Sequence, residues 1–180
     1  MGIRKKGLSS IVAIIAIILI TIAAAGFIAG IIVPLVKNQL NEGAECLGYE
    51  DYFTFYEDFD YNCYENVSGN WMYGFSIEAD SVSEEKAEKV KGFRLQFLRS
   101  GESIAVNVED GAVVTNEMRM LDLSVENFDI PVQGEVRTYI YNSTELFDFV
   151  GISPLMESGR VCDETDKIDI RGRICTISLI

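Results

Sequence analysis

The feature that most constrains this chain is an unbroken run of 29 residues without a charged side chain, from Leu8 to Val36. Between Ile11 and Val33 the run holds 14 Ile, Leu, Val or Phe residues. Together these residues favour insertion into a bilayer by roughly 4–8 kcal/mol. As an α-helix the run would be roughly 43 Å long, whereas the apolar core of a bilayer is about 30 Å thick. The sequence therefore predicts a membrane-spanning helix over residues 8–40, with Asn41 and Gly43 as its stop signals.

The charges on either side of the run predict its orientation. Three basic residues precede it at positions 4–6, whereas one lysine and two glutamates follow it at Lys37, Glu42 and Glu45. Basic residues next to a membrane helix favour the cytoplasmic side. We therefore expect the N-terminus in the cytoplasm, residues 41–180 outside the cell, and the protein in the cell membrane.

Three fates of the apolar run are open. Secretory cleavage after Ala25 would satisfy the small-residue rule at Ala23-Ala24-Ala25, but it would leave the apolar residues 27–36 at the new N-terminus. Cleavage between Gly7 and Leu8 would retain the helix whole. Without cleavage, the run would be a plain signal anchor.

The residues around Gly7 resemble a known signal type. Lys5-Lys6-Gly7-Leu8-Ser9-Ser10-Ile11-Val12 resembles the class III signal of type IV pilins, and the layout as far as Pro34 resembles pilin-type proteins of small archaea. The resemblance implies that Gly7 is the last leader residue and Leu8 the first mature residue, cut by a prepilin peptidase. Residues 1–7 would then be the leader, 8–40 the helix, and 41–180 an extracellular β-rich domain. The fifth mature position holds Val12, where bacterial type IV pilins carry glutamate, and archaeal members often lack that glutamate.

Small residues in the run favour contact between helices. Gly26 and Gly30 form a G-x-x-x-G pair, which lets two helix backbones approach closely in an apolar medium. Such spacing also arises by chance in ordinary membrane helices. Pro34 removes one backbone donor, so we expect a kink near the outer face of the membrane.

Composition argues against two broad classes of function. The chain has 28 acidic and 15 basic residues and a net charge of −13, which disfavours binding to nucleic acid. It has no histidine, and the sequence contains no G-x-S-x-G, P-loop or dinucleotide-binding motif. We therefore predict a protein that is not an enzyme.

Four cysteines follow the apolar run, at Cys46, Cys63, Cys162 and Cys175. An even number in an exported segment predicts two disulfides. Three pairings are open, and short local loops favour Cys46–Cys63 with Cys162–Cys175. The alternative of a zinc site is disfavoured, because the sequence has no C-x-x-C pair.

Alternating apolar and polar residues after Cys46 predict a β-rich domain. Residues 93–97 and 104–108 flank Ser100-Gly101 and predict a β-hairpin. Other candidate strands lie at residues 51–56, 71–78, 118–125, 135–141 and 173–179, and Ser83–Lys89 could form one or two helical turns. We therefore predict an α+β chain, in which a long hydrophobic helix precedes an antiparallel β-sandwich. The resemblance implies that this sandwich is of the pilin or archaellin kind.

Two kinds of polar site are candidates in this domain. Asp58, Asp60 and Asn62 match the start of a calcium-binding loop, but its sixth and twelfth positions hold Cys63 and Gly69. Calcium is therefore a weak candidate, and no other cofactor is expected. Asn66-Val67-Ser68 and Asn142-Ser143-Thr144 are sequons, which predict N-glycosylation of an exported domain.

The resemblance implies a structural subunit of an archaeal type IV pilus-like adhesion filament, and the features above agree with that expectation. The resemblance implies that the subunit lies in the membrane before assembly and that dedicated machinery then assembles it into a helical homo-oligomer. An archaellum subunit is the second choice within the same filament hypothesis. A monomeric membrane-anchored receptor, adhesin or minor pilin is the alternative of a different class.

Overall fold

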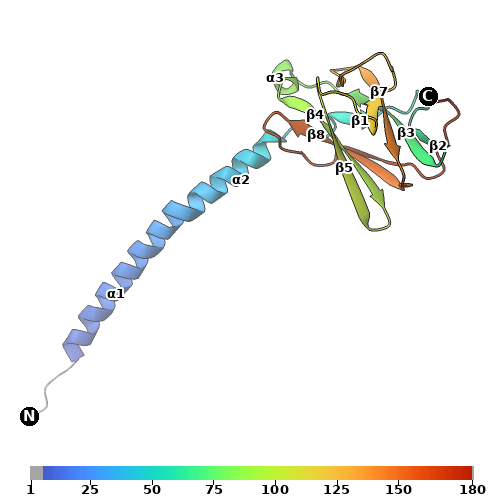
Figure 1. The fold of residues 1–180 in the computed structure, drawn as a ribbon. Helices are drawn as coiled ribbons and strands as arrows, with labels where there is room; N and C mark the ends of the chain where they lie inside the picture. The colour runs from blue at the N-terminus through green and yellow to red at the C-terminus, as the bar shows by residue number, and fades with distance from the viewer. Residues whose placement is uncertain (1–5, 180) are drawn as a thin grey trace, which may run out of the picture. The chain divides into compact units, whose positions relative to one another are not determined.

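The computed structural model describes residues 6–179, with side chains described for residues 12–37 and from Ala44 onward. The chain divides into two compact units after Leu47. The N-terminal unit is helical, and the C-terminal unit contains two antiparallel sheets (Figure 1). The predicted α+β class is confirmed.

The helical unit is longer than expected. It consists of α1 (Lys6–Phe27), a π-helical turn η1 (Ile28–Ile32) and α2 (Val33–Glu45). The end predicted at residue 40 is wrong, because a helix tolerates an isolated Asn or Gly at a cost of about 1 kcal/mol or less. The left-handed backbone that commonly follows a helix end occurs instead at Gly48, where φ is 84°.

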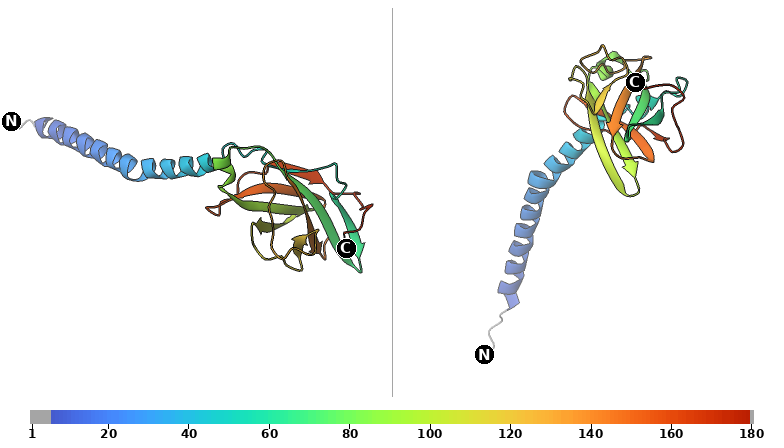
Figure 2. Two further views of the ribbon diagram at one scale, coloured as in Figure 1. Left: turned by 90° about the horizontal axis from the view of Figure 1, so that it is seen from above. Right: turned by 45° about the vertical axis from the view of Figure 1, so that its right-hand side comes forward.

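The π-helical turn ends at Ile32, two residues before Pro34. Proline has no N–H to donate to the carbonyl of Gly30, four residues earlier. Within the turn, the N–H of Val33 donates to the carbonyl of Ile28, five residues earlier. Inserted π turns and prolines both bend helices, and Figure 2 shows the helix changing direction in this region.

Nine strands form the two sheets of the second unit. The five-stranded sheet has the order β1-β3-β7-β6, with β2 also paired to β3, and the four-stranded sheet has the order β5-β4-β8-β9. The strands of the first sheet are β1 (Phe53–Phe55), β2 (Cys63–Val67), β3 (Asn70–Ala79), β6 (Met118–Met120) and β7 (Val136–Ser143). Those of the second are β4 (Val90–Arg99), β5 (Glu102–Glu109), β8 (Phe149–Met156) and β9 (Asp166–Asp169). The short helix expected after Ser83 is α3 (Glu84–Ala87).

Two tight turns connect neighbouring strands. Ser100 and Gly101 join β4 to β5, and Ser68 and Gly69 join β2 to β3. All four residues have positive φ, as a two-residue turn of the hairpin type requires. The β4–β5 hairpin predicted from the sequence is thus confirmed, with Phe97 opposite Ile104.

Other strand predictions fail. The strand expected at residues 118–125 ends at Met120, and residues 173–179 form only a single β-bridge, through Ile174. Three strands, β2, β8 and β9, were not predicted. In β8, Gly151 and Pro154 resemble strand breakers, yet β8 pairs with β4 on one side and with β9 on the other.

Aromatic rings from both sheets form one core. Phe97 of β4 stacks on Tyr141 of β7 with 4.3 Å between ring centroids, and Phe93 meets Tyr139 at 5.0 Å. Phe93, Phe97 and Tyr139 are fully buried. Burial of such rings is the main source of stability for a domain of this size.

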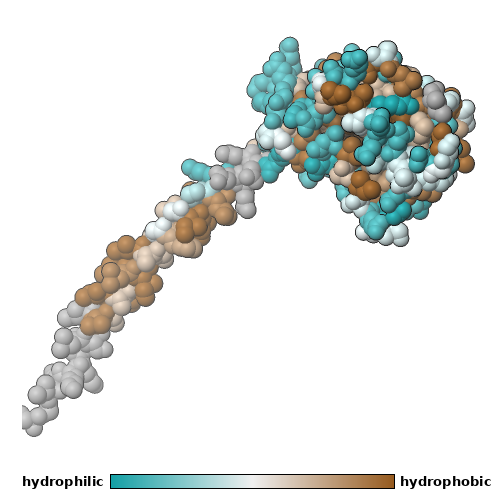
Figure 3. Space-filling view, in the orientation of Figure 1, coloured by the Kyte–Doolittle hydropathy of each residue, from teal (hydrophilic) through white to brown (hydrophobic). Residues whose placement is uncertain are grey.

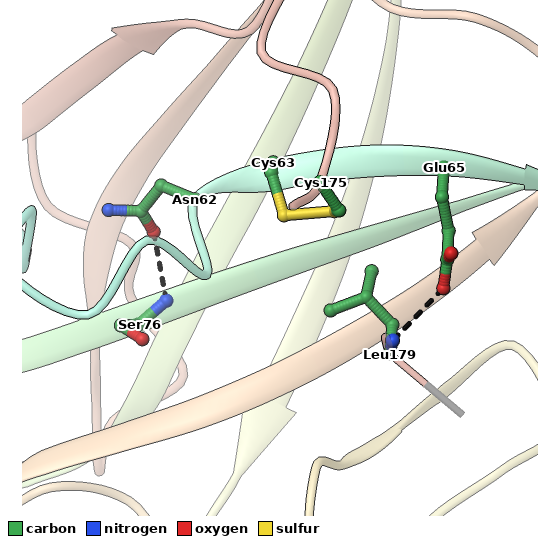
Figure 4. The surroundings of a disulfide bond; sticks show 6 residues. All are labelled: Asn62, Cys63, Glu65, Ser76, Cys175 and Leu179. Atoms are coloured by element: carbon green, nitrogen blue, oxygen red, sulfur yellow. Dashed lines mark hydrogen bonds between the residues drawn. A yellow bond between two sulfur atoms is a disulfide. The ribbon is translucent and has the colours of Figure 1, made fainter. Parts of the chain in front are cut away.

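A terminal segment covers the opposite face of the five-stranded sheet. We call residues 173–179 the C-terminal strap. Leu179 is fully buried against Cys63, Met72 and Ile140, and its N–H donates to the carboxylate of Glu65 at 3.0 Å (Figure 4). The strap therefore completes the domain by packing, without forming a strand.

Candidate functional site

The candidate functional site of the N-terminal unit is the surface of its helix. Every large apolar side chain described between Val12 and Val36 is exposed, with exposed fractions from 41% at Ile32 to 67% at Ile20. Figure 3 shows predominantly hydrophobic residues on the visible side of this part of the helix, with paler residues between them. Covering these side chains would contribute on the order of 10 kcal/mol. The helix therefore requires an apolar environment.

The length and composition of the helix fit a membrane. Residues Val12–Lys37 form one helix that is long and apolar enough to cross a membrane. A signal sequence has the same properties. The helix is thus long and apolar enough for a membrane anchor or for a signal sequence, and the predicted position in the cell membrane stays a prediction.

The small residues of the helix are open to a partner. Beyond the local helix backbone, no atom of the described residues lies within 4 Å of the position that a β-carbon would take at Gly26 or Gly30. Gly26 lies in α1 and Gly30 in the π turn. Close packing of a second helix at these positions stays a prediction.

The predicted cleavage site lies at the start of α1. Gly7 and Leu8 belong to the helix by backbone, and their side chains lie outside the described residues. Cleavage between them stays a prediction.

The favoured disulfide pairing is wrong. Cys63 of β2 pairs with Cys175 of the strap, 112 residues away, so neither Cys46–Cys63 nor Cys162–Cys175 forms. All four cysteines are disulfide-bonded, as expected for an exported domain. The preference for short loops failed because the strap lies against β2 of the first sheet. The N–H of Tyr64 donates to the carbonyl of Arg173 at 2.9 Å, which places the two sulfurs within bonding distance.

The calcium candidate does not assemble. Asn62 is buried; its amide oxygen accepts from the N–H of Ser76 at 2.9 Å, and its amide nitrogen donates to the carbonyl of Tyr56 at 2.8 Å. Asp58 and Asp60 are exposed. Among the described residues, no group of three or more His, Cys, Asp or Glu is arranged to hold a metal ion. Asn62 therefore has a structural role, joining the β1–β2 loop to β3.

The two sequons differ in accessibility. Asn66 is exposed at the end of β2, where its side-chain oxygen accepts from the N–H of Gly69 at 3.2 Å. Asn142 is half-buried, and its amide nitrogen donates to the carbonyl of Asn116 at 2.7 Å. A glycan is attached through the amide nitrogen. Asn66 is therefore the better acceptor in the folded domain, although glycosylation of either residue stays a prediction.

The most perturbed titratable groups serve the fold. Burial raises the pKa of Tyr139 well above its usual value and that of Tyr73 to about 12. Both hydroxyls donate to backbone carbonyls, Tyr139 to Asp129 at 2.7 Å and Tyr73 to Glu145 at 3.0 Å. These tyrosines anchor loops to the core, and neither is placed as a general base.

Sequence reasoning missed the residues that hold the strap. Arg119 donates to the carbonyl of Leu179 at 2.8 Å, and Glu65 accepts from its N–H. An arginine in a short β6 and a glutamate in β2 carry no local sign of this role. The one local sign in the sequence is that Leu179 is apolar, which is consistent with its burial.

Neither a scan against models of known protein families nor a search of curated proteins finds a match to this chain. The resemblance carried by residues 4–36 therefore stands on those residues alone.

Proposed function

We propose that this chain is the structural subunit of an archaeal type IV pilus-like surface filament that serves in adhesion. The observation that carries the proposal is the exposed helix. Its apolar surface is uncovered along residues 12–36, although the second unit has a complete core of its own. A helix of this kind is a ready contact surface for lipid or for identical helices.

The same helix suits both the membrane-inserted subunit and the subunit assembled in a filament. In the membrane, lipid would cover the 26 residues from Val12 to Lys37, which are long and apolar enough to cross a bilayer. In a filament, the helices of neighbouring copies replace the lipid, and the environment stays apolar. Gly26 and Gly30 allow close approach of backbones, and the bend near Pro34 lets the helix curve as it packs.

The second unit is proposed to form the outer layer of the filament. Its two sheets share an aromatic core, which supports a pilin-like β-sandwich. The disulfides suit an extracellular position. We propose that a prepilin peptidase cuts between Gly7 and Leu8 and that dedicated machinery assembles the mature chain.

The first experiment is to determine the N-terminus of the protein from native cell envelopes by mass spectrometry. A mature start at Leu8 supports the proposal, and a start at Gly26 would mean secretion of a soluble domain. Gly7→Val should block processing, whereas Gly2→Val in the same leader is the matched control and should be processed normally. Processing of both variants at wild-type rate would refute the class III signal.

The second experiment asks whether the mature chain forms sedimentable polymers with the helix in their core. Protection of residues 12–36 from hydrogen exchange in detergent-free polymers is the expected result. A monomeric membrane-anchored receptor or adhesin is the other candidate, favoured by the length of the helix, which by itself suffices for an anchor. An uncut protein that never sediments as a polymer would favour that candidate.

A further inference from the structure

The four-stranded sheet has one long edge that nothing in the described part of the chain covers. This edge is β5, which pairs only with β4. Figure 1 shows the β4–β5 hairpin reaching beyond the neighbouring strands. An open edge presents unpaired N–H and C=O groups that can bond to another strand.

The other edges of the domain are protected. The strap bonds to β2, where the N–H of Cys175 donates to the carbonyl of Tyr64 at 3.0 Å. Strands β1 and β6 have three residues each, and β9 has four residues, of which three are charged. Short or charged strands are ordinary devices against edge pairing. Strand β5 is different, with eight residues and an uncharged interior from Ser103 to Val108.

The only two charges of β5 are neutralised within the hairpin. Glu102 pairs with Arg99 at 2.8 Å, and Glu109 pairs with Lys91 at 2.6 Å. The glutamates therefore repel an approaching strand only weakly. Ile104 is 38% exposed, and it lines a hollow of about 370 Å³ beside Tyr141. The edge thus combines free backbone groups with uncovered apolar surface.

We propose that two copies of this chain associate edge to edge, through antiparallel pairing of β5 with β5. In such a pair, residues directly opposite each other lie on the same face of the sheet. Centring the pair on Ala105 places Ile104 opposite Val106 and Ser103 opposite Asn107. It places no glutamate opposite an acidic residue.

The neighbouring register is less favourable. Centring the pair on Val106 sets Glu102 opposite Asp110 twice, which brings like charges together. The register centred on Ala105 also places the β-branched Ile104 and Val106 opposite each other on the inner face. On the outer face it places the two copies of Ala105 opposite each other. Of these two registers, the one centred on Ala105 is the more complementary, and this self-complementarity favours a second copy as the partner.

The expected association is weak for free molecules. Two edges bury less area than the roughly 1,200 Å² of a stable complex, and each chain carries a net charge of −13. Confinement to a membrane or a polymer raises the local concentration enough to offset this. A two-fold contact closes after two copies. If the proposed filament exists, this contact would therefore link subunits of adjacent filaments and would not build one filament.

The test uses the full chain in detergent micelles, where the dimer does not depend on filament assembly. Because the four native cysteines are disulfide-bonded, Ala105→Cys introduces the sole free thiol. In register 105 the two new β-carbons lie about 5 Å apart, so mild oxidation should give a covalent dimer. Asn107→Cys is the matched control, since its two copies would be about 13 Å apart.

A second pair of variants measures association without crosslinking. Ala105→Lys should lower the association constant about tenfold or more, because two ammonium groups then face each other. Gln96→Lys adds the same charge to the same face, on the adjacent strand β4 opposite Ala105, and should change association less than about twofold. Sedimentation equilibrium measures both. Raising salt from about 0.05 to 0.5 M should strengthen wild-type association by screening the net charge.

Dimerisation through the helix alone gives no reason for Ala105→Cys to crosslink more than Asn107→Cys. Equal crosslinking of Ala105→Cys and Asn107→Cys, or none in either, would overturn the proposal. Equal weakening by Ala105→Lys and Gln96→Lys would also overturn it. The fluorescence of Trp71, the single tryptophan, verifies that each variant is folded. Failure of these tests leaves the mature N-terminus at Leu8 untouched, so the two proposals fail separately.

Discussion

Replacing Cys63 and Cys175 together by alanine should lower the free energy of unfolding by about 3–4 kcal/mol. The bond joins residues 112 positions apart. In the chain-entropy account, closing a loop of that length destabilises the unfolded chain by about 4.7 kcal/mol, against about 3 kcal/mol for a loop of some 15 residues. The expected value is lower than the full figure because the other disulfide bonding of the chain already restricts the unfolded state.

The structure supplies a built-in reporter for this experiment. Trp71 of β3 lies edge-on to Tyr64 of β2 with 5.6 Å between ring centroids, and the backbone of Tyr64 bonds to the strap. No tryptophan lies in the helix. Urea unfolding in micelles, followed by Trp71 fluorescence, therefore reports on the second unit alone.

The control is Ile174→Ala, which changes an apolar strap residue that is 69% exposed. It should cost less than about 0.5 kcal/mol. A loss of unfolding free energy below about 1 kcal/mol for the double alanine variant would refute the reasoning. Such a small loss is not compatible with a bond that closes a loop of 112 residues. Peptide mapping without reduction gives a direct answer, since a fragment that links Cys46 to Cys63 would contradict the structure.

Three further predictions concern the strap, the sequons and an exposed ion pair. Leu179→Ala should destabilise the domain by about 2–3 kcal/mol in urea unfolding, because it empties a fully buried site; a loss as small as that of Ile174→Ala would mean that the strap does not pack. If the exported protein is glycosylated, Asn66→Gln should reduce its mass by one glycan, whereas Asn142→Gln should remove no glycan. The reverse result would show that Asn142 is modified before folding. The Arg171 side chain hydrogen-bonds Asp169 and lowers the pKa of that carboxyl to about 2, so its contribution to stability is present above about pH 4 and is lost as the pH falls towards 2. Carboxyl-carbon NMR should show this low midpoint, and Arg171→Gln should return it to the ordinary range near 3.9; an unchanged midpoint would exclude Arg171 as the cause.

Local patterns in the chain were enough for its simplest elements. The β4–β5 hairpin follows from alternation around Ser100-Gly101, because period-two burial and a turn that needs positive φ both act over a few residues. The helix follows from its composition. Its end was misplaced, since Asn41 and Gly43 act only as weak local signals and the left-handed glycine came later, at Gly48.

Elements held by distant contacts were beyond prediction. Strand β8 has neighbours on both sides, β4 and β9, and this packing outweighs the local preferences of Gly151 and Pro154. The disulfide partner of Cys63 depends on the path of the last residues across the first sheet. Asn62 matched a calcium loop by spacing, but the N–H of Ser76 uses its oxygen.

The sequence by itself determined that this protein carries an apolar helix in need of lipid or partner helices, and that an acidic, cysteine-containing β-rich unit follows it. Hydrophobicity and charge act on each residue wherever it lies, so they can be read along the chain. Only the tertiary structure decided which cysteines pair, that the last seven residues described form a strap, and that β5 is left as the open edge. These depend on which segments meet in space, and contacts between residues far apart in the chain leave no local pattern.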